Sequence, residues 1–190
     1  MPGGNPYVSP LLVDIADGAQ ILNTTTETIM APDFTFAASD PRIYQGATFN
    51  IRSWFDVSNV VTTPGTLTIR VRWGGVAGTV LASSGAITLS STARSNYSGS
   101  VDIDLVVRSI GSAGSMFCQG RLFLNDVPVA VDSLPQGIYS MGSAGANVPA
   151  VVSSLDTTTS KALSVTAQFS VNTATTQLTN HIRVLKSYTS

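Results

Sequence analysis

The main pattern along this chain is an alternation of apolar and polar residues with a period of two. Between residues 66 and 73, for example, Leu67, Ile69, Val71 and Trp73 share one parity, and threonines and arginines occupy the other. This period predicts strands that bury one face and expose the other. Strands are expected at 11–15, 19–23, 27–30, 47–57, 66–73, 101–107, 115–125, 162–171 and 181–188.

No window combines a helical period with helix-capping residues, so the fold is expected to be all-β. Short, near-regularly spaced strands are typical of a jelly-roll-like β-sandwich, and we predict one such domain over residues 21–190. Residues 1–20 are predicted to form an extended N-terminal arm, with a disordered tail as the alternative, because the prolines and glycines up to about Pro10 argue against regular pairing. The Gly- and Ala-rich stretch at about 128–149 predicts a long loop.

The composition is poor in charge. Only 11% of the 190 residues are charged and 43% are hydrophobic, against roughly 25% charged in an average soluble domain. Solubility usually requires more surface charge than this. Such a surface suits a subunit whose faces are covered by neighbouring proteins.

The charge distribution also argues against several classes of partner. The formal net charge is −1 and Lys and Arg form no cluster, so neither nucleic acid nor an anionic membrane surface is expected as a partner. No stretch is long and apolar enough to predict a membrane span, and the first residues lack the order of a secretory signal, which predicts synthesis in the cytoplasm. The single cysteine, Cys118, excludes an internal disulfide.

Residues with catalytic potential are few. His181 is the only histidine, so any Ser/His/Asp triad would need it, but its place on the polar parity of the last strand, beside Arg183, favours a structural or surface role. Cys118 lies within an apolar strand and is expected to be buried and unreactive. No G-x-S-x-G nucleophile motif is present.

Carboxylates and aromatic residues offer two further possibilities. Asp102 and Asp104 share one face of a strand and could serve a glycosidase or bind calcium, but a solvated face or a subunit salt bridge is the favoured interpretation. The run from Asp14 to Gly18 resembles only part of a calcium loop and predicts a turn. Trp54 has the polar parity of its strand and could form part of a sugar-binding platform.

Two N-glycosylation patterns, at Asn23 and Asn96, are interpreted as chance matches because no secretory signal precedes them. No catalytic, cofactor-binding or metal-binding residue is therefore assigned. We expect a protein that is not an enzyme, without a cofactor or a small-molecule ligand.

Several segments of the chain resemble structural proteins of tailed bacteriophages. The resemblance rests on Ile21–Met30 with the following Pro32, Phe34 and Phe36, on Leu67–Ser83 with its Arg-Trp-Gly-Gly sequence, and on Val107–Gly120. It implies a jelly-roll-like virion protein, either a head decoration (cement) protein or a minor tail or fibre component. It supplies no catalytic signature.

Three functional hypotheses follow. The favoured one is a capsid decoration protein that binds the major capsid protein and copies of itself, as a homotrimer located in the virion and assembled in the host cytoplasm. The second is a tail-fibre or receptor-binding component, in which Trp54 would contribute to host binding. The third is a glycan-active enzyme that uses Asp102 and Asp104.

Overall fold

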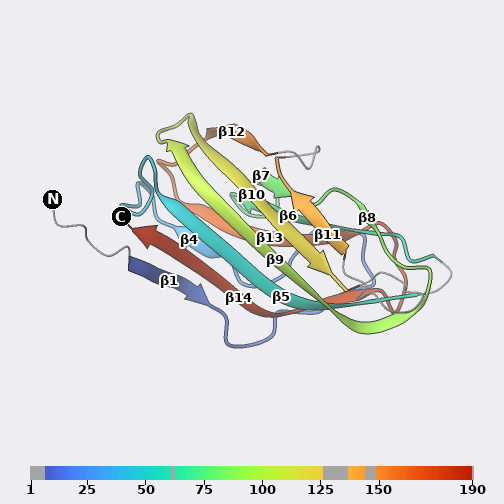
Figure 1. Ribbon diagram of the computed structural model, residues 1–190. Coiled ribbons are helices and arrows are strands. Elements are labelled where there is room, and N and C mark those ends of the chain that lie inside the picture. The colour runs from blue at the N-terminus through green and yellow to red at the C-terminus, as the bar shows by residue number, and fades with distance from the viewer. Residues whose placement is uncertain (1–6, 61–62, 126–136, 144–148, 190) are drawn as a thin grey trace.

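The computed structural model describes residues 7–60, 63–125, 137–143 and 149–189 and contains no helix among them. Two antiparallel sheets pack face to face (Figure 1). The larger sheet contains β1 (Tyr7–Val13), β2 (Ile21–Leu22), β5 (Thr48–Asn59), β9 (Arg94–Ser109), β10 (Gly114–Leu124), β11 (Gly137–Met141), β12 (Ala150–Leu155) and β14 (Gln177–Thr189). The smaller contains β3 (Thr28–Ile29), β4 (Phe34–Phe36), β6 (Thr66–Trp73), β7 (Thr79–Ser83), β8 (Ile87–Thr88) and β13 (Lys161–Phe169). The predicted all-β sandwich is confirmed.

The order of strands explains how the chain joins the two layers. The larger sheet has the order β1-β14-β5-β9-β10-β11, and the smaller has β3-β13-β6-β7. The chain passes between the sheets repeatedly, for example from β5 to β6 and from β13 to β14. The strands of these two crossings are neighbours, β5 beside β14 and β6 beside β13. Segments from the two ends of the chain therefore lie side by side in both sheets.

One apolar core lies between the sheets, as the period of two predicts. Phe49, Ile51, Phe55 and Val57 of β5 are buried in it, and so are the four apolar residues of β6. Phe36 stands at one end of this core, with its ring centroid 5.3 Å from Phe49 and 5.6 Å from Trp73. The alternation therefore located both long strands and their inward faces.

The N-terminal segment differs from its prediction. Residues 1–6 lie outside the described residues, but Tyr7–Val13 form β1, which pairs antiparallel with β14. The expectation that the segment up to about Pro10 cannot pair was wrong. Proline is tolerated because β1 is an edge strand, and a register shift follows directly between Pro10 and Leu12.

The loop predicted at about 128–149 is interrupted by a strand. Gly137–Met141 form β11, which pairs with the second half of β10. The flanking residues 128–136 and 144–148 lie outside the described residues. Short strands at 34–36, 79–83, 87–88 and 150–155 also escaped the sequence analysis, because each is too short to display a period.

A bulge in β14 reverses the faces of the last strand. The pairing with β5 shifts between Asn180 and Ile182, so Leu178 and Asn180 are buried before the bulge, and Arg183 and Leu185 are buried after it. Arg183 was expected on the polar face beside His181, and this expectation was wrong. Its guanidinium instead lies between the sheets with Nε 3.5 Å from Asp14 Oδ2, and burial lowers the pKa of Arg183.

Candidate functional site: the outer face of the larger sheet

The most distinctive surface is the outer face of the larger sheet, the face that points away from the smaller sheet. Residues directly opposite one another on paired strands share a face, so the register places outer side chains in rows that run across the strands. Two apolar rows enclose two polar rows on this face. The strands β14, β5, β9 and β10 that carry all four rows lie side by side in Figure 1.

The first apolar row, here called the Tyr188 row, crosses six strands from β1 to β12. Each residue is paired with the next one in the series Val8, Tyr188, Thr48, Val106, Phe117 and Val151. Val8, Tyr188 and Val151 are exposed. The guanidinium carbon of Arg108 lies 5.3 Å from the centre of the Phe117 ring.

The second apolar row, the Trp54 row, crosses the same sheet farther along the strands. It pairs Ile182, Trp54, Ser100, Phe123 and Ile138 in that order. Trp54 is 42% exposed and Ile138 is 65% exposed. The prediction that Trp54 points outwards is confirmed.

Between these rows lie six polar side chains of β5, β9 and β10, which we call the polar centre: Asn50, Arg52, Asp102, Asp104, Gln119 and Arg121. Lys186 of β14 and Ser140 of β11 continue the same rows, opposite Asn50 and Arg121. Asn50 connects the two aspartates of the polar centre. Although it is on the outer face, it is only 3% exposed, and its Nδ2 lies 2.8 Å from Asp102 Oδ1 and 2.9 Å from Asp104 Oδ1. Arg52 Nη2 lies 3.2 Å from Asp102 Oδ2.

The polar centre also contains groups that are free to bind. Arg121 and Gln119 are exposed and form no hydrogen bond or ion pair with any residue that the structure describes. The whole polar centre, with Tyr188, Val106, Phe117 and Gly120, lines an open depression of about 660 Å³. Among the residues that line the depression two carboxylates balance two guanidiniums, and Lys186, opposite Asn50 on β14, adds one positive charge beside it.

The predicted pair Asp102 and Asp104 is thus brought together on this face, with Asn50 and Arg52 as partners. Arg108, which shares their parity, contacts the Phe117 ring instead. Within the chain, Asp102 forms a salt bridge with Arg52, and a salt bridge from this pair to another subunit stays a prediction. The described residues contain no group of three His, Cys, Asp or Glu side chains placed to hold a metal ion.

His181 lies at the bulge of β14 and is partly exposed. Its Nδ1 lies 2.9 Å from Asp17 Oδ1, and its Nε2 lies 3.3 Å from Asp56 Oδ2. The hydrogen bond that His181 donates to Asp17 raises the pKa of His181, and the one that it donates to Asp56 acts in the same direction against partial burial. The ring fastens the turn at Asp14–Gly18 to β5 and β14, which agrees with a structural role.

Cys118 is fully buried in β10, as predicted. Burial, followed by the negative charge of Asp104, raises the pKa of its thiol to about 12. The thiolate is therefore not populated near neutral pH. Asn23 and Asn96, the two glycosylation matches, both have positive φ, at 55° and 53°, which is typical of asparagine in turns.

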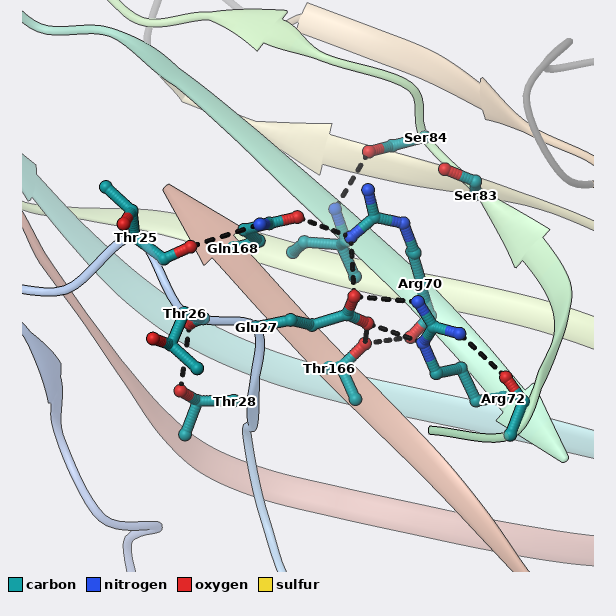
Figure 2. A network of polar contacts seen from close by, with 12 residues as sticks. Thr25, Thr26, Glu27, Thr28, Arg70, Arg72, Ser83, Ser84, Thr166 and Gln168 are labelled. Atoms are coloured by element: carbon teal, nitrogen blue, oxygen red, sulfur yellow. Dashed lines mark hydrogen bonds and ion pairs between the residues drawn. The ribbon is translucent and has the colours of Figure 1, made fainter. Parts of the chain in front are cut away.

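A second polar cluster, on the outer face of the smaller sheet, escaped the sequence analysis. Figure 2 shows Glu27 reaching over β13 to the two arginines of β6. Arg72 Nε and Nη2 donate to Glu27 at 2.6 and 2.7 Å, Arg70 Nη1 donates at 2.9 Å, and Thr166 Oγ1 donates to the same carboxylate. Burial raises the pKa of Glu27, but these hydrogen bonds and charges outweigh it and lower the pKa overall.

The Glu27 cluster is a structural clamp. Its carboxylate is saturated by partners within the chain, and Gln168 extends the network by accepting from Arg70 at 2.9 Å and donating to Thr25 O at 3.1 Å. The segment before β3 is thereby held against the smaller sheet. The alternating arginines of β6 were visible in the sequence, but nothing there identified Glu27 as their partner.

Comparisons with known proteins identify no family. No family model matches the chain, and no curated protein matches its sequence. Among solved structures, the chain is similar to the CBM2 module of the evolved Dit of Lactobacillus casei BL23 phage J-1, at 9% identity and a TM-score of 0.41, with 98% of this chain and 99% of that chain covered. At this identity and TM-score the likeness defines neither a family nor a shared function.

The fold and the outer face together define an all-β sandwich with one built, solvent-open polar depression. Within the described part of the chain, no helix could span a membrane.

Proposed function

We propose that this chain is a non-catalytic structural protein of a tailed-bacteriophage virion that binds a surface ligand through the outer face of its larger sheet. The sequence resemblance to phage structural proteins supports the virion assignment. The polar depression between the Tyr188 row and the Trp54 row supports ligand binding. This is the receptor-binding alternative of the sequence analysis.

The observation that carries the proposal is the order of polar and apolar rows. A protein–protein interface usually has a core depleted of charge and a polar rim. The outer face has the opposite arrangement, because two aspartates, two arginines and two amides lie at its centre and the apolar side chains flank them. Concave sites with a few converging polar groups are typical of ligand binding.

A non-catalytic role agrees with the chemistry of the candidate nucleophile and carboxylates. The raised pKa of Cys118 keeps its thiol protonated. Asp102 and Asp104 both accept from Asn50 Nδ2, and Arg52 is the further partner of Asp102.

Capsid decoration is the second candidate, and the β1 edge of the larger sheet favours it. Val8 and Val13 on edge strand β1 are both about half exposed, and Ile15 just beyond is 97% exposed. An exposed apolar edge beside a strand with free backbone groups suits contact with a neighbouring protein. In this form of the proposal the partners are the major capsid protein and copies of this chain in a trimer.

The experiment compares the two surfaces in two binding assays. Fluorescently labelled protein is mixed with a panel of bacterial strains and, separately, with expanded empty phage capsids. An outer-face variant, Trp54→Ala with Arg121→Ala, is compared with an edge variant, Val13→Ser with Ile15→Ser, because neither of these residues belongs to the two apolar rows or lines the depression. Ile110→Ala is the control, because Ile110 is equally exposed but lies in the turn between β9 and β10.

Saturable binding to cells that only the outer-face variant loses is the expected result. Saturable binding to capsids that only the edge variant loses would replace it with the decoration role. Binding to neither target, in protein whose circular dichroism spectrum shows the folded β-sandwich, would contradict both.

A further inference from the structure

We propose that the depression of the outer face binds an uncharged saccharide of several rings. This inference rests on the proposed function, because it names the ligand class of the same face. It is argued from the donors and acceptors of the polar centre, from its charge balance, and from the position of the exposed rings.

The polar centre offers donors and acceptors together. A sugar hydroxyl both donates and accepts, so it is matched by a site in which carboxylate oxygens alternate with amide and guanidinium groups. Here the carboxylates of Asp102 and Asp104 lie beside the guanidiniums of Arg52 and Arg121, with Gln119 next to them. All five project from paired strands, where the sheet fixes their spacing.

Part of this arrangement is already organised. Asn50 is buried beneath the two carboxylates and donates to both, so it orients their oxygens without a ligand. It also donates to the backbone oxygen of Ile103 at 3.3 Å. Ligand binding then requires little ordering of the acceptors, which lowers its entropic cost.

The charge balance argues for an uncharged ligand. The two carboxylates and two guanidiniums in the depression cancel, and Arg52 is already paired with Asp102. A polyanion would meet the carboxylates of Asp102 and Asp104 at close range, and a cation would meet the arginines. A polyhydroxylated chain satisfies both sets without bringing a charge into the site.

Exposed rings stand at opposite sides of the polar centre. Tyr188 lines the depression in one apolar row, and Trp54 lies in the other row. Their places on β14 and β5 correspond to a separation along the strands of six residues, from Thr48 to Trp54, or about 20 Å at the rise of a strand. Aromatic faces pack against the apolar C–H face of a sugar ring, and this spacing suits a ligand longer than one ring.

The test begins with an array of immobilised microbial glycans, neutral and acidic, probed with the labelled protein. Each neutral glycan that binds is then titrated in solution while tryptophan emission is recorded. Trp73 is buried and Trp54 is exposed, so the emission change reports on Trp54, and Trp54→Ala, which lacks this reporter, is titrated by isothermal calorimetry instead. Wild type, Trp54→Ala, Arg121→Ala and the control Ile110→Ala are compared, and cells that bind the protein are retested after periodate oxidation of vicinal diols.

We expect neutral glycans to bind, Trp54→Ala and Arg121→Ala each to weaken binding about tenfold or more, and Ile110→Ala to leave it unchanged. Periodate should remove the binding to cells. If cells bind through the outer face but binding survives periodate and no glycan binds, the saccharide inference is wrong while the proposed function stands. Binding confined to acidic glycans would also overturn the saccharide inference. If neutral glycans bind but cells do not, the saccharide inference stands and the proposed receptor-binding role is wrong.

Discussion

Arg72 forms a bidentate ion pair with Glu27, with Nε 2.6 Å from one carboxylate oxygen and Nη2 2.7 Å from the other. Parallel donation of this kind is the strongest geometry available to an ion pair. The side chains of Glu27 and Arg72 are only 13% and 15% exposed, so water can do little to compensate either group if the ion pair is broken. Glu27 is also the only glutamate of the chain, and it is the ion-pair partner of both Arg70 and Arg72.

The first prediction concerns this clamp. Glu27→Gln should lower the free energy of unfolding by about 2–3 kcal/mol, because it leaves the charges of Arg70 and Arg72 partly buried without a counter-ion. Denaturant unfolding followed by circular dichroism measures the change. Asp156→Asn is the control, since Asp156 is a solvent-exposed turn residue, and it should cost less. An equal loss of stability in both variants would contradict the prediction that the ion pairs of Glu27 stabilise the fold.

The second prediction concerns pH. The pKa of His181 is raised in the folded protein, chiefly by Asp17, so folding stabilises the protonated ring. Its contribution is fully present below the unfolded pKa near 6.5 and is lost as the pH rises through the higher folded value. Unfolding midpoints between about pH 5.5 and about pH 8.5 should therefore fall more steeply for wild type than for His181→Gln.

Because His181 is the only histidine, its proton resonances can be followed by NMR without assignment. Their midpoint should lie above that of a histidine in the unfolded chain, and Asp17→Asn should bring it down. A midpoint at or below the unfolded value would contradict the proposed bonding to Asp17 and Asp56.

The sequence was most informative where a strand is long and one of its faces is buried. The alternation in residues 66–73 matches β6 residue for residue, and that in residues 47–57 locates most of β5. Gly74 and Gly75, which directly follow β6, have φ of 103° and 82°. Arg183 was assigned to the wrong face because the bulge between Asn180 and Ile182 changes which residues of β14 point inward, and the amino-acid composition does not reveal such a bulge.

The candidate site was only partly predictable, for a different reason. Parity alone placed Trp54, Asp102 and Asp104 on outward faces. It could not show that Trp54 is paired with Ile182, or that Asn50 lies beneath both aspartates, because these relationships depend on the register between strands far apart in the chain. The two apolar rows likewise exist only once β14, β5, β9 and β10 are aligned.

The third prediction concerns Cys118. With its side chain buried and its pKa raised to about 12, the thiol should not react with a thiol reagent such as DTNB in the native protein at neutral pH. It should react fully once the protein is unfolded in guanidinium chloride. Rapid labelling of the native protein, at the rate of a free thiol, would mean that β10 is not covered as described.

The fourth prediction concerns Gly120, which lies in β10 next to the polar centre. A Cβ added there would overlap the backbone oxygen of Asp102 and lie 2.7 Å from Ile103 Cα, so Gly120→Ala must push β9 away from β10. We expect a loss of about 2–3 kcal/mol in the free energy of unfolding, as for other overpacked sites, with shifted amide resonances for Asp102 and Asp104. Gly46→Ala is the control, because a Cβ at Gly46 meets nothing within 4 Å and strains only a residue with φ of 93°. It should cost about 1–2 kcal/mol and leave the resonances of the polar centre in place. If Gly120→Ala is as stable as wild type, the close approach of β9 to β10 at the depression is wrong.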